Sequence, residues 1–505
     1  MSKHLSLIKL FLPGLLLTGC VEIPNLSVDH LPFSEPVACQ VPSYYKTSTS
    51  QAIPVIPNWW TLFKDEELNQ LVQKVDEGSF ELKAGLARVE RACAVLGINR
   101  ADLYPQINGE GSIQKIRTSK NDSSNVGGGR NNNYNQYRAS MGMEWEFDLW
   151  GRIKYLVASA EADVEATMLA QQDLRLSLKG QLAQNYFALR FLDEERRVLS
   201  DAVNVRLDNV KLATDRFDAG KTGELDVARA ETELATARAA LAAISGQRTR
   251  LENAIAVIIG EPASEFRISR SSKAPNYLPA ILAGVPMNVL ENRPDVAAQI
   301  KTLKSIYTRI GSAKADFLPR VSLISSAGLS SVDIGNFISW SSRTFTLGPS
   351  ISAPIFQGGR LRANQKQIEA EFKEAVADYQ QIVLVAIQEV EDALADLASA
   401  SNQRDAQLEA LSASRKSLNL SILRYKEGLV NSLETIDATR EQLNIERGYV
   451  QIRALEYDAT VRLIRALGGA SCLDAEACQE CGCIYHTCNC VIENIQEAIA
   501  GSVVP

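Results

Sequence analysis

Hydrophobic residues recur along this chain with two different periods, which predict two kinds of secondary structure. In the segment 137–149 the odd-numbered positions are apolar, while most even-numbered positions are polar or charged. Alternation with period two is typical of a β-strand that has one apolar and one hydrated face. The segment 103–118 alternates less regularly, and the polar, glycine-rich segment 119–135 separates the two. We predict a β-hairpin here.

A second pair of strand-like segments, 317–331 and 343–356, lies later in the chain. The last one places four apolar side chains on one side: Phe345, Leu347, Ile351 and Ile355. A half-buried sheet in a soluble sandwich is the simpler interpretation, but two hairpins are too few to build one. Strands of about 10 residues can cross an outer membrane when their sheet closes into a barrel. We therefore expect several chains to pool their hairpins into one transmembrane β-barrel.

The rest of the chain carries the spacing of α-helices that pack in coiled coils. Between residues 227 and 258 apolar residues recur at alternating intervals of three and four, and only Arg248 interrupts them. A later set repeats every seven residues: Ile436, Leu443, Val450, Tyr457 and Ile464. Such spacing predicts helices with a neighbour along their length. The segment 152–215 would be about 95 Å long if it were helical throughout, so we predict long coiled coils.

The two halves of the chain resemble each other at a nearly constant offset. The segment RFDAGKTGELD, 216–226, aligns with RYKEGLVNSLE, 424–434. Three further pairs keep the same order: 101–105 with 315–319, 150–152 with 358–360, and 258–261 with 466–469. This indicates a duplicated unit of roughly 200 residues, each with a helical stretch, a hairpin and two long helices.

This organisation predicts six segments. They are a signal peptide (1–19), an extended N-terminal arm (20–64), a first repeat (65–262), a linker (263–293), a second repeat (294–470) and a cysteine-rich tail (471–505). Pro294 followed by Asp295 is suited to the start of a helix.

The letters Gly220-Lys221-Thr222 also close a nucleotide-binding P-loop, so an ATPase has to be considered. A P-loop needs a glycine five residues earlier, between a strand and a helix. That position is Asp215, in a segment that reads as helix. Glycine tolerates the backbone angles of a turn or helix end. We therefore predict that Gly220 and Gly428 form the turns between paired helices.

The N-terminus has a basic start, a short apolar core and the ending Leu17-Thr18-Gly19-Cys20. The apolar core is too short to span a bilayer and predicts an export signal. Its ending resembles the lipobox of bacterial lipoproteins, which implies lipidation at Cys20. An ordinary signal peptide with an unrelated cysteine is the alternative. Val21 follows the cysteine, and the same resemblance then implies sorting to the outer membrane.

Composition argues against several classes of function. The net charge of −7 and the isoelectric point near 5.4 argue against a nucleic-acid partner. Only three histidines occur in 505 residues, so histidine-dependent hydrolysis and histidine–zinc chemistry have little to draw on. We expect neither an enzyme nor a cofactor.

In order along the chain, these features resemble one family, the outer membrane factors, or TolC-like channels, in their lipidated OprM and NodT branch. The segments NWWTLFKDEELNQLV, LENRPDV and LRYKEGLVNSLETIDATREQL carry the resemblance, which covers about 20–470. It implies a mainly α fold with β: a long coiled-coil α-helical periplasmic barrel, and four transmembrane strands per chain completing a trimeric twelve-stranded β-barrel. It also implies a homotrimer anchored in outer-membrane lipid, which conducts small molecules from an RND-type inner-membrane pump and a periplasmic adaptor.

The resemblance assigns a periplasmic gate to the helix tips. Asp226 in the first tip, and Glu434 and Asp437 in the second, match acidic positions that form rings at the constriction. Tyr425 matches a tyrosine of the closing contacts, whereas Val430 replaces a basic residue of the family. Solvated carboxylates near helix starts are the structural alternative.

Two questions stay open at this point. The tail holds Cys478, Cys481, Cys483, His486, Cys488 and Cys490. Disulfides are favoured for an exported segment, with a zinc site and an unstructured appendage as alternatives; Cys93 is expected to be a small core residue. For the whole protein, the alternatives are a duct for type I protein secretion, or a lipid-anchored structural coiled coil without a pore.

Overall fold

The computed structural model describes residues 58–118, 133–271, 274–279, 281, 293–427 and 429–469. In the first half of the chain the elements are η2 (Trp59–Phe63), α1 (Glu66–Gly78), α2 (Phe80–Ala101), β1 (Gln106–Arg117), β2 (Asn133–Phe147), α3 (Arg152–Asp218) and α4 (Glu224–Ile259). In the second half they are α6 (Pro294–Ala315), β3 (Arg320–Ser331), η4 (Ile334–Asn336), η5 (Trp340–Ser342), β4 (Arg343–Ser352), α7 (Arg360–Lys426) and α8 (Ser432–Ala466).

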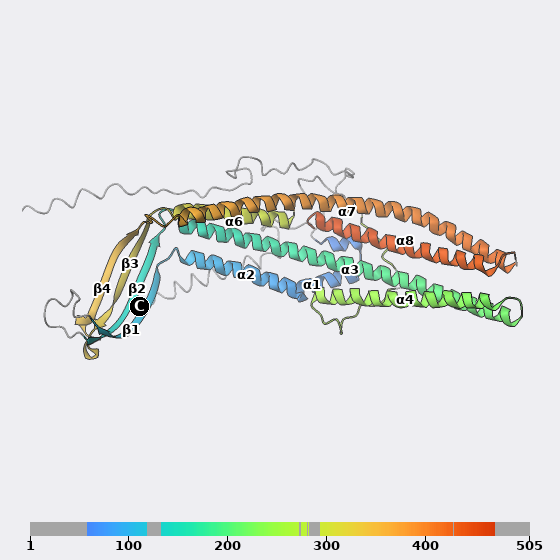
Figure 1. The fold of residues 1–505 in the computed structure, drawn as a ribbon, viewed down its shortest axis with the longest axis horizontal. Helices are drawn as coiled ribbons and strands as arrows, with labels where there is room; N and C mark the ends of the chain where they lie inside the picture. Colours follow the sequence, from blue (N-terminus) through green and yellow to red (C-terminus); the bar gives the residue numbers. More distant parts are fainter. Residues whose placement is uncertain are drawn as a thin grey trace, which may run out of the picture.

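The molecule is elongated, with the β-sheet at one end and two helical tips at the other (Figure 1). Helices α3 and α7 have 67 residues each, which corresponds to a length of about 100 Å. Each turns back at its tip into a shorter helix, α4 or α8. The prediction of one continuous helix over 152–215 is confirmed. Among the described residues, no helix combines the length and the apolarity that crossing a membrane requires.

The helical stretch predicted at the start of the first repeat is divided into α1 and α2 at Ser79. Two chain segments approach each other closely at this point. A Cβ atom on Gly78 would lie 2.1 Å from the carbonyl oxygen of Ile259, at the end of α4. Only glycine permits this contact. The sequence pattern of the stretch is helical on both sides and gives no sign of the distant neighbour.

The four strands form one antiparallel sheet in the order β1-β2-β3-β4. Tyr137 of β2 stands opposite Ile113 of β1 and Ser331 of β3, and Ala327 stands opposite Phe345 of β4. Residues opposite each other share a face of the sheet. The apolar residues of one face are therefore Ile107, Ile113, Tyr137, Ala139, Met141, Met143, Trp145, Phe147, Val321, Leu323, Ala327, Leu329, Phe345, Leu347, Pro349 and Ile351.

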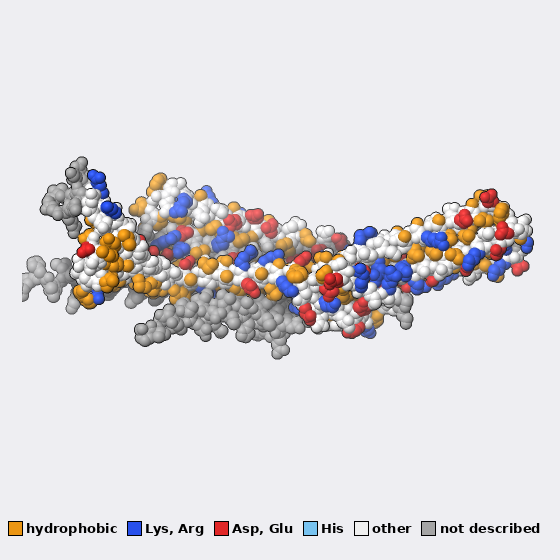
Figure 2. Space-filling view, turned by 90° about the horizontal axis from the view of Figure 1, so that it is seen from below, with side chains coloured by type: hydrophobic (Ala, Val, Ile, Leu, Met, Phe, Trp, Pro, Cys, Tyr) orange, Lys and Arg blue, Asp and Glu red, His pale blue; other side chains and the backbone are white. Residues whose placement is uncertain are grey.

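The opposite face is mostly polar, built from glutamine, asparagine, serine, threonine, glycine and charged residues, with Ile116, Tyr134 and Ile324 as its large apolar or aromatic exceptions. The alternation predicted over 137–149 is confirmed as far as Phe147, where β2 ends. Leu149 and Ile355 lie beyond the ends of their strands. Much of the apolar face is left open by the described part of the chain: Ile113 is 78% exposed and Ile351 is 72% exposed. Figure 2 shows apolar side chains gathered over this end of the molecule.

The main hydrophobic core lies where α1, α3, α4 and α8 meet, at mid-length of the helical part. Trp59 and Phe63 of η2 insert into it. The Phe63 ring lies 4.7 Å from that of Phe187, which lies 4.9 Å from that of Tyr457. Tilted contacts of this kind add about 1 kcal/mol per pair beyond burial. The segment before α1 is thereby fastened to the middle of the long helices.

The predicted coiled-coil positions form the buried side of the helices. Leu234, Ala237, Ile244, Ile255 and Ile258 are buried in α4. In α8 the buried residues include four of the heptad positions: Leu443, Val450, Tyr457 and Ile464. Arg248, which interrupts the apolar spacing of α4, is buried as well. A buried arginine needs compensating partners, and the structure provides them.

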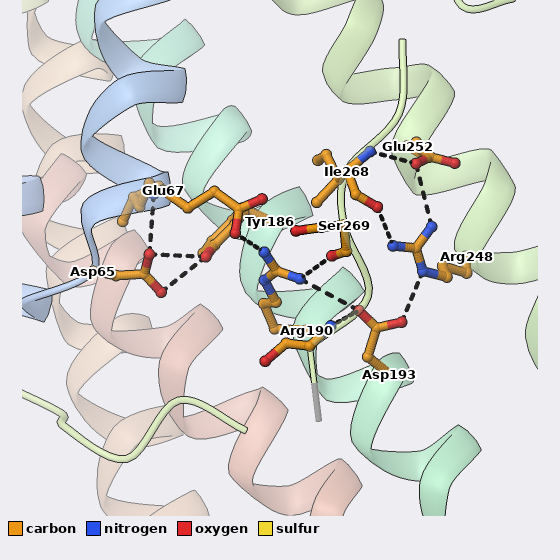
Figure 3. A network of polar contacts seen from close by, with 11 residues as sticks. Asp65, Glu67, Tyr186, Arg190, Asp193, Arg248, Glu252, Ile268 and Ser269 are labelled. Atoms are coloured by element: carbon orange, nitrogen blue, oxygen red, sulfur yellow. Dashed lines mark hydrogen bonds and ion pairs between the residues drawn. The ribbon is translucent and has the colours of Figure 1, made fainter. Parts of the chain in front are cut away.

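A network of charged side chains surrounds Arg248 (Figure 3). Asp193 of α3 accepts hydrogen bonds from Arg248 Nε at 2.7 Å and from Arg190 Nη1 at 3.4 Å. Arg248 Nη2 donates to the backbone carbonyl of Ile268, and Arg190 Nη1 donates to that of Ser269, at 2.8 and 2.7 Å. Glu252 accepts from the Ile268 N–H at 2.6 Å. The network therefore fastens the extended segment after α4 to α3 and α4.

A second polar cluster lies at the start of α6. The Arg293 guanidinium donates two hydrogen bonds to the Asp295 carboxylate. It also donates to the Glu389 carboxylate of α7 and to the carbonyl of Ala466 at the end of α8. Asp173 of α3 lines the same polar pocket. Burial raises the pKa of the Asp173 carboxyl above its ordinary value, and the nearby Asp295 carboxylate adds to the shift.

Asparagine at Asp173 is therefore expected to stabilise the protein at pH 7. A carboxyl whose pKa is higher in the folded state costs stability once it ionises, so the cost appears as the pH rises through that pKa. The temperature at which the protein unfolds should rise for Asp173→Asn at pH 7, and by less at pH 4. The control is Asp163→Asn, because Asp163 is exposed on the same helix. An equal gain at both pH values would contradict this explanation.

Candidate functional site

The candidate gate lies at the two helix tips, far from the sheet (Figure 1). Gly220 follows the end of α3 with φ +66, in the left-handed region that favours glycine. The N–H of Lys221 donates to the carbonyl of Arg216 at 2.9 Å and that of Gly220 to Phe217 at 2.8 Å, which closes the helix end. Lys221 and Thr222 belong to this turn, between two helices. Gly428, predicted for the second tip, lies outside the described residues.

Each predicted gate carboxylate has a partner within the chain. Glu434, in the first turn of α8, forms an ion pair with Arg424 of α7 at 2.8 Å. Asp437, one turn further, lies 3.5 Å from Arg440 of the same helix. Asp226, in the first turn of α4, accepts a hydrogen bond from the Ser432 hydroxyl at 2.8 Å.

Tyr425 lies in the last turn of α7, where the Arg216 guanidinium stands 4.5 Å from its ring centroid. Arg216 belongs to α3, so this cation–π contact joins the two helical hairpins, α3–α4 and α7–α8. The hydrogen bond between Asp226 and Ser432 joins them too. Two of the four predicted side chains thus take part in bonds between the hairpins.

A further link between the hairpins is centred on Glu233 of α4. Its Oε1 lies 2.6 Å from Arg440 Nη2 of α8, and its Oε2 lies 3.1 Å from Arg206 Nη2 of α3. Arg206 is almost fully buried, and burial lowers the pKa of its guanidinium while Glu233 opposes the shift. One carboxylate therefore holds two arginines from different helices.

These links border a groove of about 350 Å³ between the two hairpins. Its apolar lining includes Val205, Leu212, Ile422 and Leu443. The hydroxyl oxygens of Thr222 and Thr435 also line it, and both are buried without a hydrogen-bond partner in the described part of the chain. The two hairpins are therefore separated by a groove here and are joined across it by polar links.

Sequence reasoning did not predict that arginines take part in this site, although the repeat contained one signal for two of them. Arg216 and Arg424 occupy the same position in the two repeats, four residues before Gly220 and Gly428. Their repetition could have indicated a role at both tips. Arg206 and Arg440 have no such signal. Together with Glu233 they meet only when the three helices α3, α4 and α8 pack together.

Other predicted sites lie largely beyond the described residues. Cys20 and the tail cysteines with His486 lie outside them. Cys93 is buried, as expected for a core residue, and it is disulfide-bonded; every other cysteine lies outside the described residues. Within the described ranges no cluster of three or more histidine, cysteine or acidic residues could hold a metal ion.

Comparisons with known proteins relate the sheet and the tips to one family. The family of outer membrane efflux proteins matches two stretches, 71–261 and 285–469. The solvent efflux pump outer membrane protein SrpC of Pseudomonas putida is 30% identical over 460 residues, which cover 90% of this chain and 96% of SrpC. The outer membrane protein OprJ of Pseudomonas aeruginosa is 31% identical over 418 residues, covering 82% of this chain and 86% of OprJ.

Solved structures show the same similarity. The outer-membrane channel OprN superimposes with a TM-score of 0.76 at 29% identity, and the alignment covers 85% of this chain and 99% of OprN.

Proposed function

Because this chain belongs to the outer membrane efflux protein family, we propose that it forms the exit duct of a tripartite pump, joined to a periplasmic adaptor and an RND-type inner-membrane pump. The chain is an outer-membrane efflux channel, and its family is not a class of enzymes. Three chains each supply four strands to a twelve-stranded barrel, and their helices form the periplasmic tunnel.

The proposal rests on one observation: the molecule has a sheet with one apolar and one polar face at one end, and helical tips joined by polar links at the other. The sheet has an apolar face that the chain leaves exposed and a polar face opposite to it. Such a sheet suits a barrel with lipid outside and water inside. Helices of about 100 Å reach from it to tips where hairpins are held together by polar links. A wide duct with a closable end needs both features.

Small molecules are the proposed cargo. The relatives include a solvent efflux pump protein and a toluene efflux pump protein, and neither name refers to protein secretion. Selectivity among compounds would reside in the pump, because the duct only receives what the pump delivers.

The anchor and the gate complete the proposal. Lipid attached to Cys20 would hold the chain in the outer membrane in addition to the barrel. Gly220 and Gly428 would form the tip turns, and Asp226, Tyr425, Glu434 and Asp437 would close the tunnel. Acidic rings of three chains favour cations, and the ion pairs with Arg424 and Arg440 would allow such rings to close without strong repulsion.

The function is tested by conductance and by export together. The purified trimer should give discrete conductance steps in a planar bilayer. Cells that lack the protein should accumulate a pump substrate, and expression with its adaptor and pump should restore export. Export of a protein instead of a small molecule would favour a secretion duct. No conductance from variants with loosened tips would favour a structural coiled coil without a pore.

Alanine at both Glu434 and Asp437 is expected to reverse the ion preference of the channel. The substitutions leave Arg424 and Arg440 without these carboxylates, so the constriction gains net positive charge. The ratio of cation to anion permeability should fall from above one to below one, measured from reversal potentials in a salt gradient. The reciprocal variant replaces Arg424 and Arg440 with glutamine. It removes positive charge and should raise the ratio of cation to anion permeability. Unchanged reversal potentials in both variants would remove these residues from the conducting path.

A further inference from the structure

The apolar face of the sheet changes character at the end that is remote from the helices. On β1 the positions of this face read Ile107, Gly109, Gly111 and Ile113, and then Lys115 and Arg117. Neighbouring positions on one face are two residues apart, so the two cations directly continue the apolar row. All of them are exposed to solvent.

The same change occurs on β4, at the other edge of the sheet. Arg343 stands opposite Leu329, which stands opposite Ala139, so it lies on the apolar face. It precedes Phe345 on that face by one position. In the barrel β4 of one chain adjoins β1 of the next, because these strands are the two edges of the sheet. Within one chain the register sets Arg343 level with Gly111 of β1, four residues before Lys115. Each chain therefore carries three cations toward the remote end of this face.

The segment between β3 and β4 gives this rim an aromatic partner. The Arg343 guanidinium lies 3.3 Å from the ring centroid of Trp340, a stacked cation–π contact. Trp340 itself is 77% exposed. The Asp333 carboxylate accepts a hydrogen bond from the Gly335 N–H, and the Ser342 hydroxyl donates to the carbonyl of Asn336. These hydrogen bonds stabilise the conformation of the segment. Tryptophan beside a cation is typical of the boundary between hydrocarbon and headgroups.

The opposite rim, next to the helices, differs. There the apolar face ends with Trp145 and Phe147 on β2 and with Val321 and Ile351 on β3 and β4. No lysine or arginine of the described strands extends the apolar face at that rim. The apolar row from Tyr137 to Phe147 is about 33 Å long, or about 25 Å high at the tilt of a barrel strand. One face thus spans the hydrocarbon and carries cations at its outer rim alone.

We propose that Lys115, Arg117 and Arg343 form a binding site for the phosphate groups of lipid headgroups in the outer leaflet. The helices are periplasmic, so the remote rim faces the outer leaflet. The described part of the chain provides no ion-pair partner for the three cations, which leaves their charge for a ligand. Arginine and lysine recognise phosphate through charge-assisted hydrogen bonds. The position beside the lipid-facing band selects phosphate that is attached to a lipid.

The site is tested on the purified full-length trimer in detergent, with lipid A as the probe. Binding is measured by native mass spectrometry with lipid A that carries two phosphates and with the same lipid after dephosphorylation. We expect the phosphorylated lipid to bind more tightly. Each cation near an anionic lipid surface contributes a factor of about five. The variant K115Q/R117Q/R343Q should therefore bind the phosphorylated lipid on the order of 100-fold more weakly.

Arg138 provides a matched control. It stands opposite Ser330, one position from the pair of Leu329 and Arg343, but on the polar face. R343Q should weaken binding about fivefold, whereas R138Q should leave it unchanged. If R343Q and R138Q weakened lipid binding equally, or if neither variant changed it, the proposal would be overturned. Displacement of the lipid by excess inorganic phosphate would reassign the cations to a site for free phosphate.

If the triple variant does not form a trimer, the comparison of R343Q with R138Q decides the question. The proposal depends on the outer-membrane barrel and not on the adaptor, pump or gate. Conductance of the variants, measured in parallel, separates loss of lipid binding from loss of the channel.

Discussion

Alanine at Asp193 is expected to destabilise the folded protein by about 3 kcal/mol, because it leaves two buried arginines without their shared carboxylate. The side chains of Arg190 and Arg248 are 4% and 8% exposed. Their remaining partners are a second carboxylate and a backbone carbonyl each. The loss should therefore fall at the lower end of the range for breaking a buried ion pair, about 3–5 kcal/mol.

The measurement has a global and a local part. The midpoint of thermal trimer dissociation should fall, and limited proteolysis should begin to cut within 263–271, the segment that the two arginines hold by its carbonyls. The control is Asp201→Ala on the same helix, which breaks an exposed ion pair with Arg197. Exposed pairs contribute less than about 1 kcal/mol. A lower midpoint without new cleavage would contradict the role of the network in fastening the segment.

Alanine at Glu233 is expected to open the channel. The carboxylate links Arg206 of α3 with Arg440 of α8, so its removal breaks the charged bridge between the two hairpins and leaves Arg206 buried without it. Hydrogen bonds to charged groups are worth about 2 kcal/mol. If the bridge exists only in the closed tip, its loss shifts the closed-to-open ratio by a factor of about 30.

Open probability in bilayer recordings is the direct measurement, and uptake of a large antibiotic by intact cells is the second. Glu231→Ala is the control, because Glu231 is exposed on the same helix and forms no ion pair in the described part of the chain. Glu233→Gln should have an intermediate effect, since an amide can still accept hydrogen bonds. An unchanged open probability for Glu233→Ala, with the trimer intact, would show that the bridge persists in the open state or does not control it.

The features predicted from the sequence are those that depend on local periodicity. Alternation placed Tyr137 through Phe147 on one face because strand geometry fixes the face by parity alone. Helical spacing identified the buried positions of α4 and α8, because the period of the helix fixes which residues share a face. Pro294 begins α6 as expected, because its ring suits the first helical turn.

The features that were missed depend on contacts between distant segments. The sequence around Gly78 gives no sign that the Ile259 carbonyl packs against it at the end of α1. Arg248 appears as a break in an apolar spacing until Asp193 is placed beside it. At the proposed gate, the resemblance supplied the carboxylates but implied a basic residue where Val430 stands. The structure provides Arg424 and Arg440 as the cations instead.

The pairing of β2 with β3 has a consequence for the order in which the protein can assemble. Tyr137 and Ser331 are neighbours in the sheet although they are about 190 positions apart in the chain. The chain must lose the entropy of closing so long a loop before the stabilising contacts between the strands form. This pairing is therefore intrinsically slow. The first hairpin must therefore wait for the second repeat to be exported. During that delay an exposed apolar strand is prone to aggregate. We expect periplasmic chaperones that hold extended chains to be required for the β-sheet more than for the helices.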